Sequence, residues 1–184
     1  MKRSIVISIL LASSIMLYSQ YKDDAVYTRK ISSNTLNEYK EIFNERRTLF
    51  VLEGGYGNEI LSNTPVNKLL IIEHFKIKPN LALGLGFGIK SYNRNRSFPA
   101  FVSLQFPKIT NKANLSMFGL KVGSAWNYYY GYGNNLLLNA SYNYGFRVSK
   151  KSFITLGGDI DYQSHGAYID DPSFTFGLTL GFVH

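Results

Sequence analysis

The C-terminal residues alternate strictly between large apolar and small side chains. In the segment FTFGLTLGF (174–182), Phe and Leu occupy the even positions, and Thr and Gly occupy the odd positions. Because successive side chains of a β-strand point to opposite sides, this pattern predicts a strand with one apolar face and one face of small residues. Segment 81–92 shows the same alternation, with Leu, Phe and Ile on one face and mainly Gly and Ala on the other.

Similar alternating runs follow one another after residue 47. They are separated by turn residues such as Pro79-Asn80, and no helical period lies between them. Because short turns join neighbouring runs, we expect eight antiparallel strands. The expected strands cover residues 48–57, 68–77, 81–92, 100–106, 115–129, 135–148, 153–163 and 173–184.

The residues opposite the apolar face indicate which face meets water. A soluble sandwich or ligand-binding barrel would carry many charges there, yet 81–92 and 173–184 carry mostly Gly, Ala and Thr. Small side chains fit the crowded interior of an eight-stranded barrel, so the apolar face would point outward. An apolar exterior is stable in lipid, where a closed barrel satisfies every backbone group. The predicted fold is therefore all-β, a transmembrane antiparallel up-and-down β-barrel.

Strand length and aromatic positions agree with this fold. Strands of about 10 residues match a tilted membrane crossing, and aromatic residues mark the two membrane interfaces of such barrels. One predicted girdle comprises Tyr92, Trp126, Tyr128, Tyr129, Tyr130, Tyr162 and Tyr168, and the other comprises Phe75, Phe106, Phe146, Phe153 and Phe182. Glu73 shares the parity of Phe75 and would face lipid, unless a β-bulge near His74 turns it inward.

The first residues have the features of a secretory signal peptide. Lys2 and Arg3 precede an apolar run, and the small residue Ser19 follows it, so we expect residues 1–19 to be removed. The alternative is an N-terminal membrane anchor, but the run is shorter than the roughly 20 apolar residues of a spanning helix. The export that this implies excludes nucleic acid as a partner.

Segment 20–47 is polar and lacks alternation. Thr35 and Glu38 have the spacing of a helix capping box, and Leu36, Tyr39 and Phe43 would share one helical face. We expect a short amphipathic helix on the periplasmic side, with a disordered spacer as the alternative. The barrel would then occupy residues 48–184.

The segments FKIKPNLALGLGFGIKSY, FPAFVSLQFPK and FTFGLTLGF together resemble the small outer-membrane β-barrel proteins of the eight-stranded OmpA/OmpX-like type, in the form found in Bacteroidetes-like bacteria. The resemblance covers roughly residues 48–184 and is one of strand pattern. It implies a monomer in the outer membrane of a Gram-negative bacterium, in contact with membrane lipid and lipopolysaccharide. Such proteins usually end on an aromatic residue that the barrel-insertion machinery recognises, whereas here Val183 and His184 follow Phe182.

An even number of strands places both ends of the barrel in the periplasm. The outward loops would be residues 59–67, 93–99, 130–134 and 164–172. Arg94 and Arg96 project from the second loop and would contact lipopolysaccharide phosphates, because guanidinium groups match phosphate geometry. The alternative is an ordinary solvated loop.

Charges are distributed unevenly along the chain, whose formal net charge is +8. The stretch 74–158 holds eleven Lys or Arg residues and no carboxylate. Charges inside a narrow barrel must be paired, so strands distant in sequence would supply the partners across the lumen. The predicted lumen network comprises Glu53, Lys90, Lys121, Arg147, Asp159 and Asp161. This network would plug the lumen, and the alternative is a narrow charged pore.

Residues with catalytic potential occur in QSHGAYIDDPS. Ser164, His165, Asp170 and Asp171 are the residue types of a nucleophilic triad, as a lipid A-modifying outer-membrane enzyme would need. However, Ser164 and His165 are adjacent and would point to opposite faces of a strand. Cysteine is absent, and His74 and His184 lack metal-ligand spacing, so we expect neither a metal nor a cofactor. The favoured function is a non-enzymatic structural or surface-interaction role.

Heat-dependent migration on SDS gels tests the outward apolar face. Closed membrane barrels resist SDS until boiled, so we expect detergent-extracted protein to change mobility on heating. Recovery of the protein in the soluble periplasmic fraction, without such a shift, would mean that the apolar face points inward.

Overall fold

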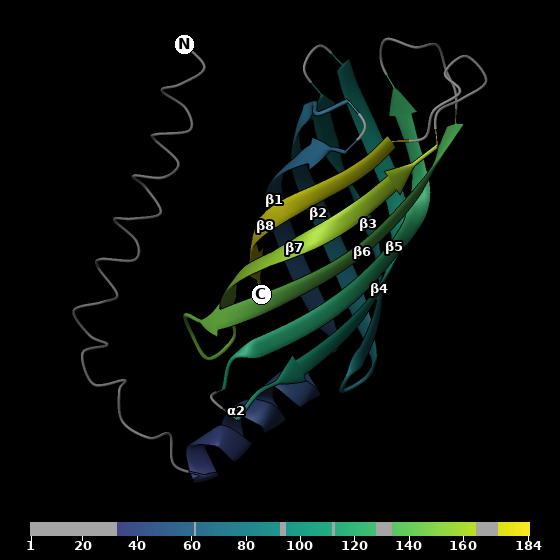
Figure 1. Ribbon diagram of the computed structural model, residues 1–184. Helices are drawn as coiled ribbons and strands as arrows, with labels where there is room; N and C mark the ends of the chain where they lie inside the picture. The colour runs from purple at the N-terminus through teal and green to yellow at the C-terminus, as the bar shows by residue number, and fades with distance from the viewer. Residues whose placement is uncertain (1–32, 61, 93–94, 112, 128–133, 165–172) are drawn as a thin grey trace. The chain divides into compact units, whose positions relative to one another are not determined.

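The computed structural model describes residues 33–60, 62–92, 95–111, 113–127, 134–164 and 173–184. An α-helix precedes eight strands (Figure 1). The elements are α2 (Ser33–Glu45), β1 (Thr48–Glu59), β2 (Pro65–Lys78), β3 (Leu81–Tyr92), β4 (Asn95–Ile109), β5 (Leu115–Asn127), β6 (Asn134–Arg147), β7 (Phe153–Gln163) and β8 (Ser173–Val183). The predicted signal peptide lies outside the described residues. Among those that are described, no helix is long and apolar enough to cross a membrane.

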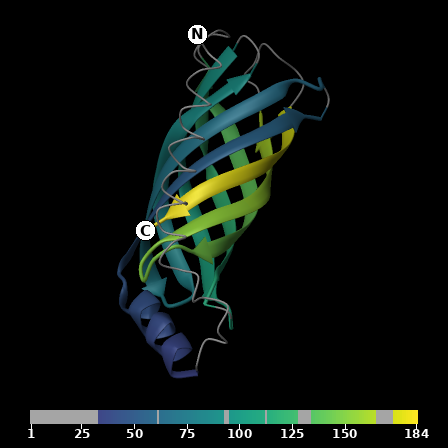
Figure 2. The same ribbon diagram turned by 90° about the vertical axis from the view of Figure 1, so that its left-hand side faces the viewer.

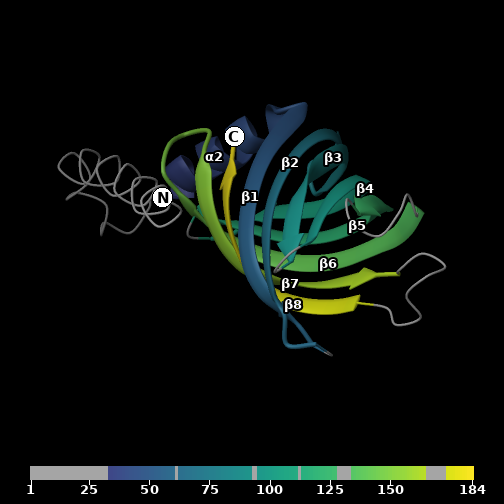
Figure 3. The same cartoon turned by 90° about the horizontal axis from the view of Figure 1, so that it is seen from above.

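The eight strands form a closed barrel, which Figure 3 shows from above. Each strand pairs antiparallel with the next, and β1 pairs antiparallel with β8. The closing seam extends to the last residue, because Phe50 and His184 exchange backbone N–H···O hydrogen bonds of 2.8 and 2.9 Å. Residues Val183 and His184 therefore complete the pairing of β1. The predicted antiparallel up-and-down barrel is confirmed.

Most strands are as long as predicted or longer. β3 and β7 have the predicted bounds, while β4 extends beyond the predicted 100–106 and includes Pro99 and Pro107. Proline has no backbone N–H to donate to a neighbouring strand, so it fits where pairing is interrupted or absent. The β3–β4 register is interrupted beside Pro99, and Pro107 lies beyond the part of β4 that pairs with β3. Because β4 begins at Asn95, the predicted loop 93–99 is wrong in its extent, and Arg96 lies within a strand.

The large apolar side chains point out of the barrel. β8 alternates between buried and exposed at every residue, and Phe176, Leu178 and Leu180 are 57–64% exposed. Many inward positions carry small or polar residues, beside a smaller set of large apolar ones. Gly86 shows why: a Cβ atom at this position would lie 2.4 Å from the ring of Phe101, which occupies the interior. The apolar exterior is thus the expected lipid-facing surface.

The structure decides whether Phe153, Tyr92 and Glu73 face the interior or the outer surface of the barrel. Phe153 was assigned to a girdle, but it is 3% exposed and packs inside the barrel. Tyr92 also points inward, where its hydroxyl donates a hydrogen bond to Gln163. Each of these two residues is an even number of positions from inward-pointing residues of its own strand, so its side chain also points inward. Glu73 is exposed on the outer surface, because the bulge in β2 lies between Lys76 and Lys78, beyond the point at which it would turn Glu73 inward.

The predicted amphipathic helix is present as α2. It begins at Ser33, so Thr35 lies inside the helix and the predicted cap position is wrong. Phe43 is 4% exposed and contacts Phe153 edge-on, with ring centroids 6.1 Å apart. The helix therefore attaches through its apolar face to one end of the barrel, visible at the bottom of Figure 2. We call this the α2 end, and the opposite end the loop end.

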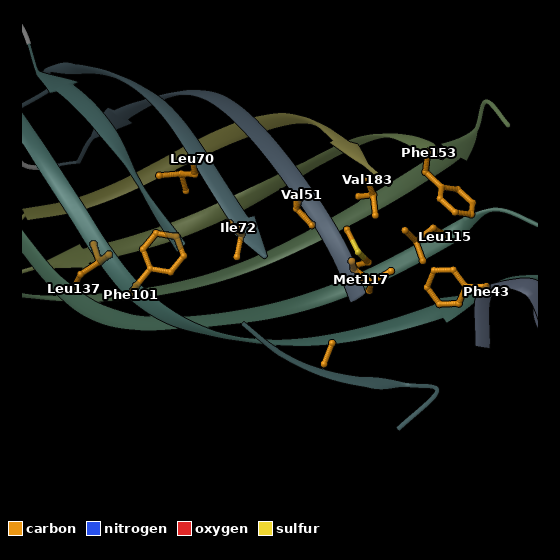
Figure 4. Packing of buried hydrophobic residues seen from close by; sticks show 12 residues of the cluster. Phe43, Val51, Leu70, Ile72, Phe101, Leu115, Met117, Leu137, Phe153 and Val183 are labelled. Atoms are coloured by element: carbon orange, nitrogen blue, oxygen red, sulfur yellow. The ribbon is translucent and has the colours of Figure 1, made fainter. Parts of the chain in front are cut away.

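Apolar side chains cluster inside the barrel at the α2 end. Figure 4 shows Phe43 beside Leu115 and Phe153, with Met117 and Val183 next to them. We call these five residues the apolar floor. Their strand members come from β5, β7 and β8, so the floor joins segments from separate parts of the barrel wall. The helix contributes one residue to a core that the strands build.

Removing the helix side chain should weaken the fold. We expect Phe43→Ala to lower the free energy of unfolding by about 3 kcal/mol, because it leaves a cavity against Phe153 and Leu115. Guanidinium titration in detergent micelles measures this change. Asn44→Ala is the matched control, because Asn44 is exposed on the same helix. Equal stability of the two variants would show that α2 does not stabilise the barrel.

Candidate functional site

An ion-pair network occupies the lumen. Lys121 on β5 donates from Nζ to both carboxylate oxygens of Glu53 on β1, each at 3.0 Å. Lys68 on β2 lies 3.3 Å from Glu53 Oε1 and also pairs with Asp159 on β7. The four strands β1, β2, β5 and β7 thus meet through four charged side chains.

Neighbouring groups extend this network. Asn139 donates from Nδ2 to Asp159 Oδ2 at 2.6 Å, so this carboxylate is held from β6 as well. Lys90 on β3 pairs with Asp161 Oδ1 at 3.0 Å. Asp159 and Asp161 are two residues apart on β7 and therefore point to the same side of the strand. The network joins β1, β2, β3, β5, β6 and β7.

The network balances its own charge. Its members are three lysines and three carboxylates, whose side chains are at most 8% exposed. An unpaired charge at such burial would cost several kcal/mol, and mutual pairing removes most of this cost. The ring of Phe101 adds an apolar wall, with its centroid 5.9 Å from Lys121 Nζ. The six charged side chains therefore pair with one another in the buried interior of the barrel.

The structure brings together five of the six residues assigned to the lumen network from sequence. They are Glu53, Lys90, Lys121, Asp159 and Asp161. Arg147 lies elsewhere: it is the last residue of β6, and its guanidinium lies 3.5 Å from the ring centroid of Tyr39 on α2. Its parity is inward, but its position at the strand end takes it out of reach of the network.

Lys68 belongs to the network and was missing from the sequence-based set. A signal for it was present, because Lys68 shares the parity of the inward residues Leu70, Ile72 and His74. Its ammonium group bridges Glu53 and Asp159, which would otherwise be two neighbouring like charges. Lys68 therefore links the two carboxylates on which the arrangement depends.

Two further polar pairs are buried in the barrel interior. His74 Nε2 is 3.0 Å from Ser103 Oγ, and Thr179 donates to Asn143 Oδ1 at 2.6 Å. Each of these contacts joins two strands that are separated by one strand in the barrel, β2 with β4 and β6 with β8, and it satisfies buried polar groups. Among the described residues, no group of three or more His, Cys, Asp or Glu residues is placed to hold a metal ion.

The α2 end has its own polar contacts. Lys76 donates to the carbonyl oxygen of Phe43, and its ammonium lies 4.0 Å from the Phe43 ring centroid. His184 Nδ1 lies 3.0 Å from Ser152 Oγ, which links the C-terminus to the β6–β7 turn. Partial burial lowers the pKa of Arg46, which lies between α2 and β1. The sequence carried no pattern that predicted the Ser152–His184 contact.

Several candidate residues fall outside the described part of the chain, namely Arg94, Tyr128, Tyr129, Tyr130, His165, Tyr168, Asp170 and Asp171. Two other candidate residues, Arg96 and Ser164, are within the described part. Arg96 is exposed at the loop end of β4, opposite Ser91. Ser164 accepts a hydrogen bond of 2.9 Å from the backbone N–H of Leu136, which ties it to β6. The proposed triad is thus represented by Ser164 alone among described residues.

The closed barrel, with its apolar exterior and its buried polar and charged side chains, has the fold of small outer-membrane barrels. Solved structures agree: Neisserial surface protein A matches with a TM-score of 0.58 and 11% identity, over 74% of this chain and 94% of that protein. The outer membrane protein OprG of Pseudomonas aeruginosa matches with a TM-score of 0.51 and 8% identity, over 77% and 97%. No protein-family model and no curated protein sequence matches the chain.

Removing one partner from the network should destabilise the barrel strongly. We expect Lys121→Met to cost about 3–5 kcal/mol, because Glu53 then loses its two-oxygen contact in a buried site. The double variant Glu53→Gln/Lys121→Met should recover a large part of this loss. Guanidinium unfolding of the wild type, both single variants and the double variant gives the coupling energy. Additive effects would contradict a direct interaction.

Proposed function

We propose that the protein is a small integral outer-membrane barrel with a plugged lumen and a structural or surface-interaction role. The observation that carries this proposal is the self-neutralising network of Glu53, Lys68, Lys90, Lys121, Asp159 and Asp161. A pore lined for one kind of ion would need an excess of one charge sign along an open path. Here the buried charges are engaged with one another.

Location in a membrane is supported by the exterior. Apolar side chains face outward on every strand, and a closed barrel satisfies the backbone in lipid. Trp126 and Phe174 are exposed near the loop end, and Phe75 and Phe106 near the α2 end. Aromatic residues at both edges of an apolar band are typical of membrane barrels. The basic and apolar N-terminal sequence supports export.

The orientation follows from the even number of strands. Both ends of the barrel chain lie at the α2 end, which in an outer-membrane barrel faces the periplasm. The apolar floor then closes the lumen on the periplasmic side, and the charge network fills it further out. A narrow pore is the alternative, and it would require both barriers to open.

Two more specific roles are lipopolysaccharide contact and lipid modification. Lipopolysaccharide contact is supported by the exposure of Arg96 at the loop end, next to the aromatic level of Phe98 and Trp126. A lipid-modifying activity is less well supported, because Ser164 hydrogen-bonds to the backbone of Leu136. We therefore favour a non-enzymatic role.

Ion conductance distinguishes the plugged barrel from the pore. We expect wild-type protein in planar lipid bilayers to show no discrete conductance steps. The Phe43→Ala variant should also stay closed, because the charge network blocks the lumen independently of the floor. A heat-dependent gel shift of the same sample provides the control for folding. Discrete steps in the folded wild type would contradict the plug and favour the narrow pore.

A further inference from the structure

Exposed cations gather around the α2 end of the barrel. They lie in the four segments that border this end: the α2–β1 linker, the end of β2, the end of β4 and the β6–β7 turn. The residues are Arg47, Lys78, Lys108, Lys150 and Lys151, all exposed, and we call them the cationic collar. Among the described residues at the loop end, Arg96 is exposed and Glu59 is partly buried. The two ends therefore differ in charge.

The collar lies just beyond the apolar band of the exterior. Lys108 follows Phe106 by two residues on the same outward face, and Lys78 follows Phe75 by three. Both Phe side chains are exposed to the surroundings of the barrel. At about 3.3 Å per residue along a tilted strand, this spacing covers the roughly 5–8 Å of a headgroup layer. The collar cations thus lie at headgroup depth, where lysine side chains extend toward phosphate.

The collar cations are available to a partner. Lys150 contacts Glu38 of α2 at 3.4 Å, but the two side chains are 70% and 52% exposed, and such surface pairs contribute only about 0–1 kcal/mol. Glu41 and Glu45 are the other exposed carboxylates of α2, so the charge of this end stays positive. By contrast, Arg147 contacts Tyr39 of α2 and is left out of the collar.

We propose that the cationic collar binds the phosphate headgroups of anionic phospholipids in the leaflet at the α2 end. This inference rests on the proposed function, under which that leaflet faces the periplasm. Three observations favour a lipid over another polyanion: the cations surround the barrel, they lie at the depth of headgroups, and outward Phe residues precede them. Each Lys or Arg at an anionic surface contributes about 1 kcal/mol, so several together select anionic from zwitterionic lipid.

Spin-labelled lipids test the collar directly. The full chain is reconstituted in phosphatidylcholine vesicles that contain trace spin-labelled phosphatidylglycerol or spin-labelled phosphatidylcholine. Electron paramagnetic resonance then gives the motionally restricted fraction of each lipid at the barrel surface. We expect at least about threefold preference for phosphatidylglycerol at low salt, falling toward one at 1 M salt because ions screen the headgroup charges.

Matched variants locate the preference. Replacing all five collar residues with Gln should reduce the ratio close to one, while Arg96→Gln at the loop end should leave most of it. Folding of each variant is checked by the heat-dependent gel shift. If the fivefold variant does not fold, the salt dependence of the wild-type ratio still decides the proposal, because a preference that is insensitive to salt does not come from exposed cations.

The outcomes separate this proposal from the one on which it rests. Insertion into phosphatidylcholine with a wild-type ratio near one would overturn the collar and leave the membrane barrel intact. If the preference for phosphatidylglycerol is lost in the Arg96→Gln variant but kept in the five-residue collar variant, binding belongs to the loop end and the collar proposal is wrong. Failure to insert into any vesicle would overturn both proposals. Collar-dependent binding of the detergent-solubilised protein to isolated cell-wall sacculi, without lipid preference, would assign the collar to the wall instead.

Discussion

The closed pairing of the backbone is the constraint on which the rest of this structure depends. In lipid, an unpaired N–H or C=O group costs several kcal/mol, so a sheet is stable there only when it has no edge. The antiparallel β1–β8 seam, extended by the Phe50–His184 hydrogen bonds, removes that edge. Once the wall is closed, its outer face can be apolar and its inner face polar. This inversion of the usual soluble arrangement explains the alternation of Gly and Thr with Phe and Leu.

The interior follows from closure and from the width that eight strands allow. Inward glycines such as Gly86 leave room for larger side chains from neighbouring strands, here the ring of Phe101 on β4. Lysine ammonium groups reach across this space to carboxylates on distant strands. Because three cations meet three anions, the buried charges need no external counter-ion. The same contacts that satisfy these charges also connect strands from opposite parts of the wall.

The two ends of the barrel differ in the way that they meet their surroundings. At the α2 end, Phe43 completes an apolar floor, and the collar cations lie outside it.

Glu73 is the unusual feature of the exterior, since it is exposed between Ile71 and Phe75 on an otherwise apolar face of β2. A carboxylate on the lipid-facing surface is destabilising there.

The sequence by itself determined which side of the wall most side chains take, because strand alternation is a local property of the backbone. It placed Glu53, Lys121 and Asp159 inside, and the same parity would have found Lys68 and Phe153. Tertiary structure decided the level of each side chain along the barrel and the residue that it contacts, because both depend on the stagger between strands far apart in sequence. Arg147 has inward parity, yet its depth brings it to Tyr39 of α2, while Lys68 reaches both Glu53 and Asp159. Alternation is written in neighbouring residues, whereas contacts across the lumen exist only once the barrel has closed.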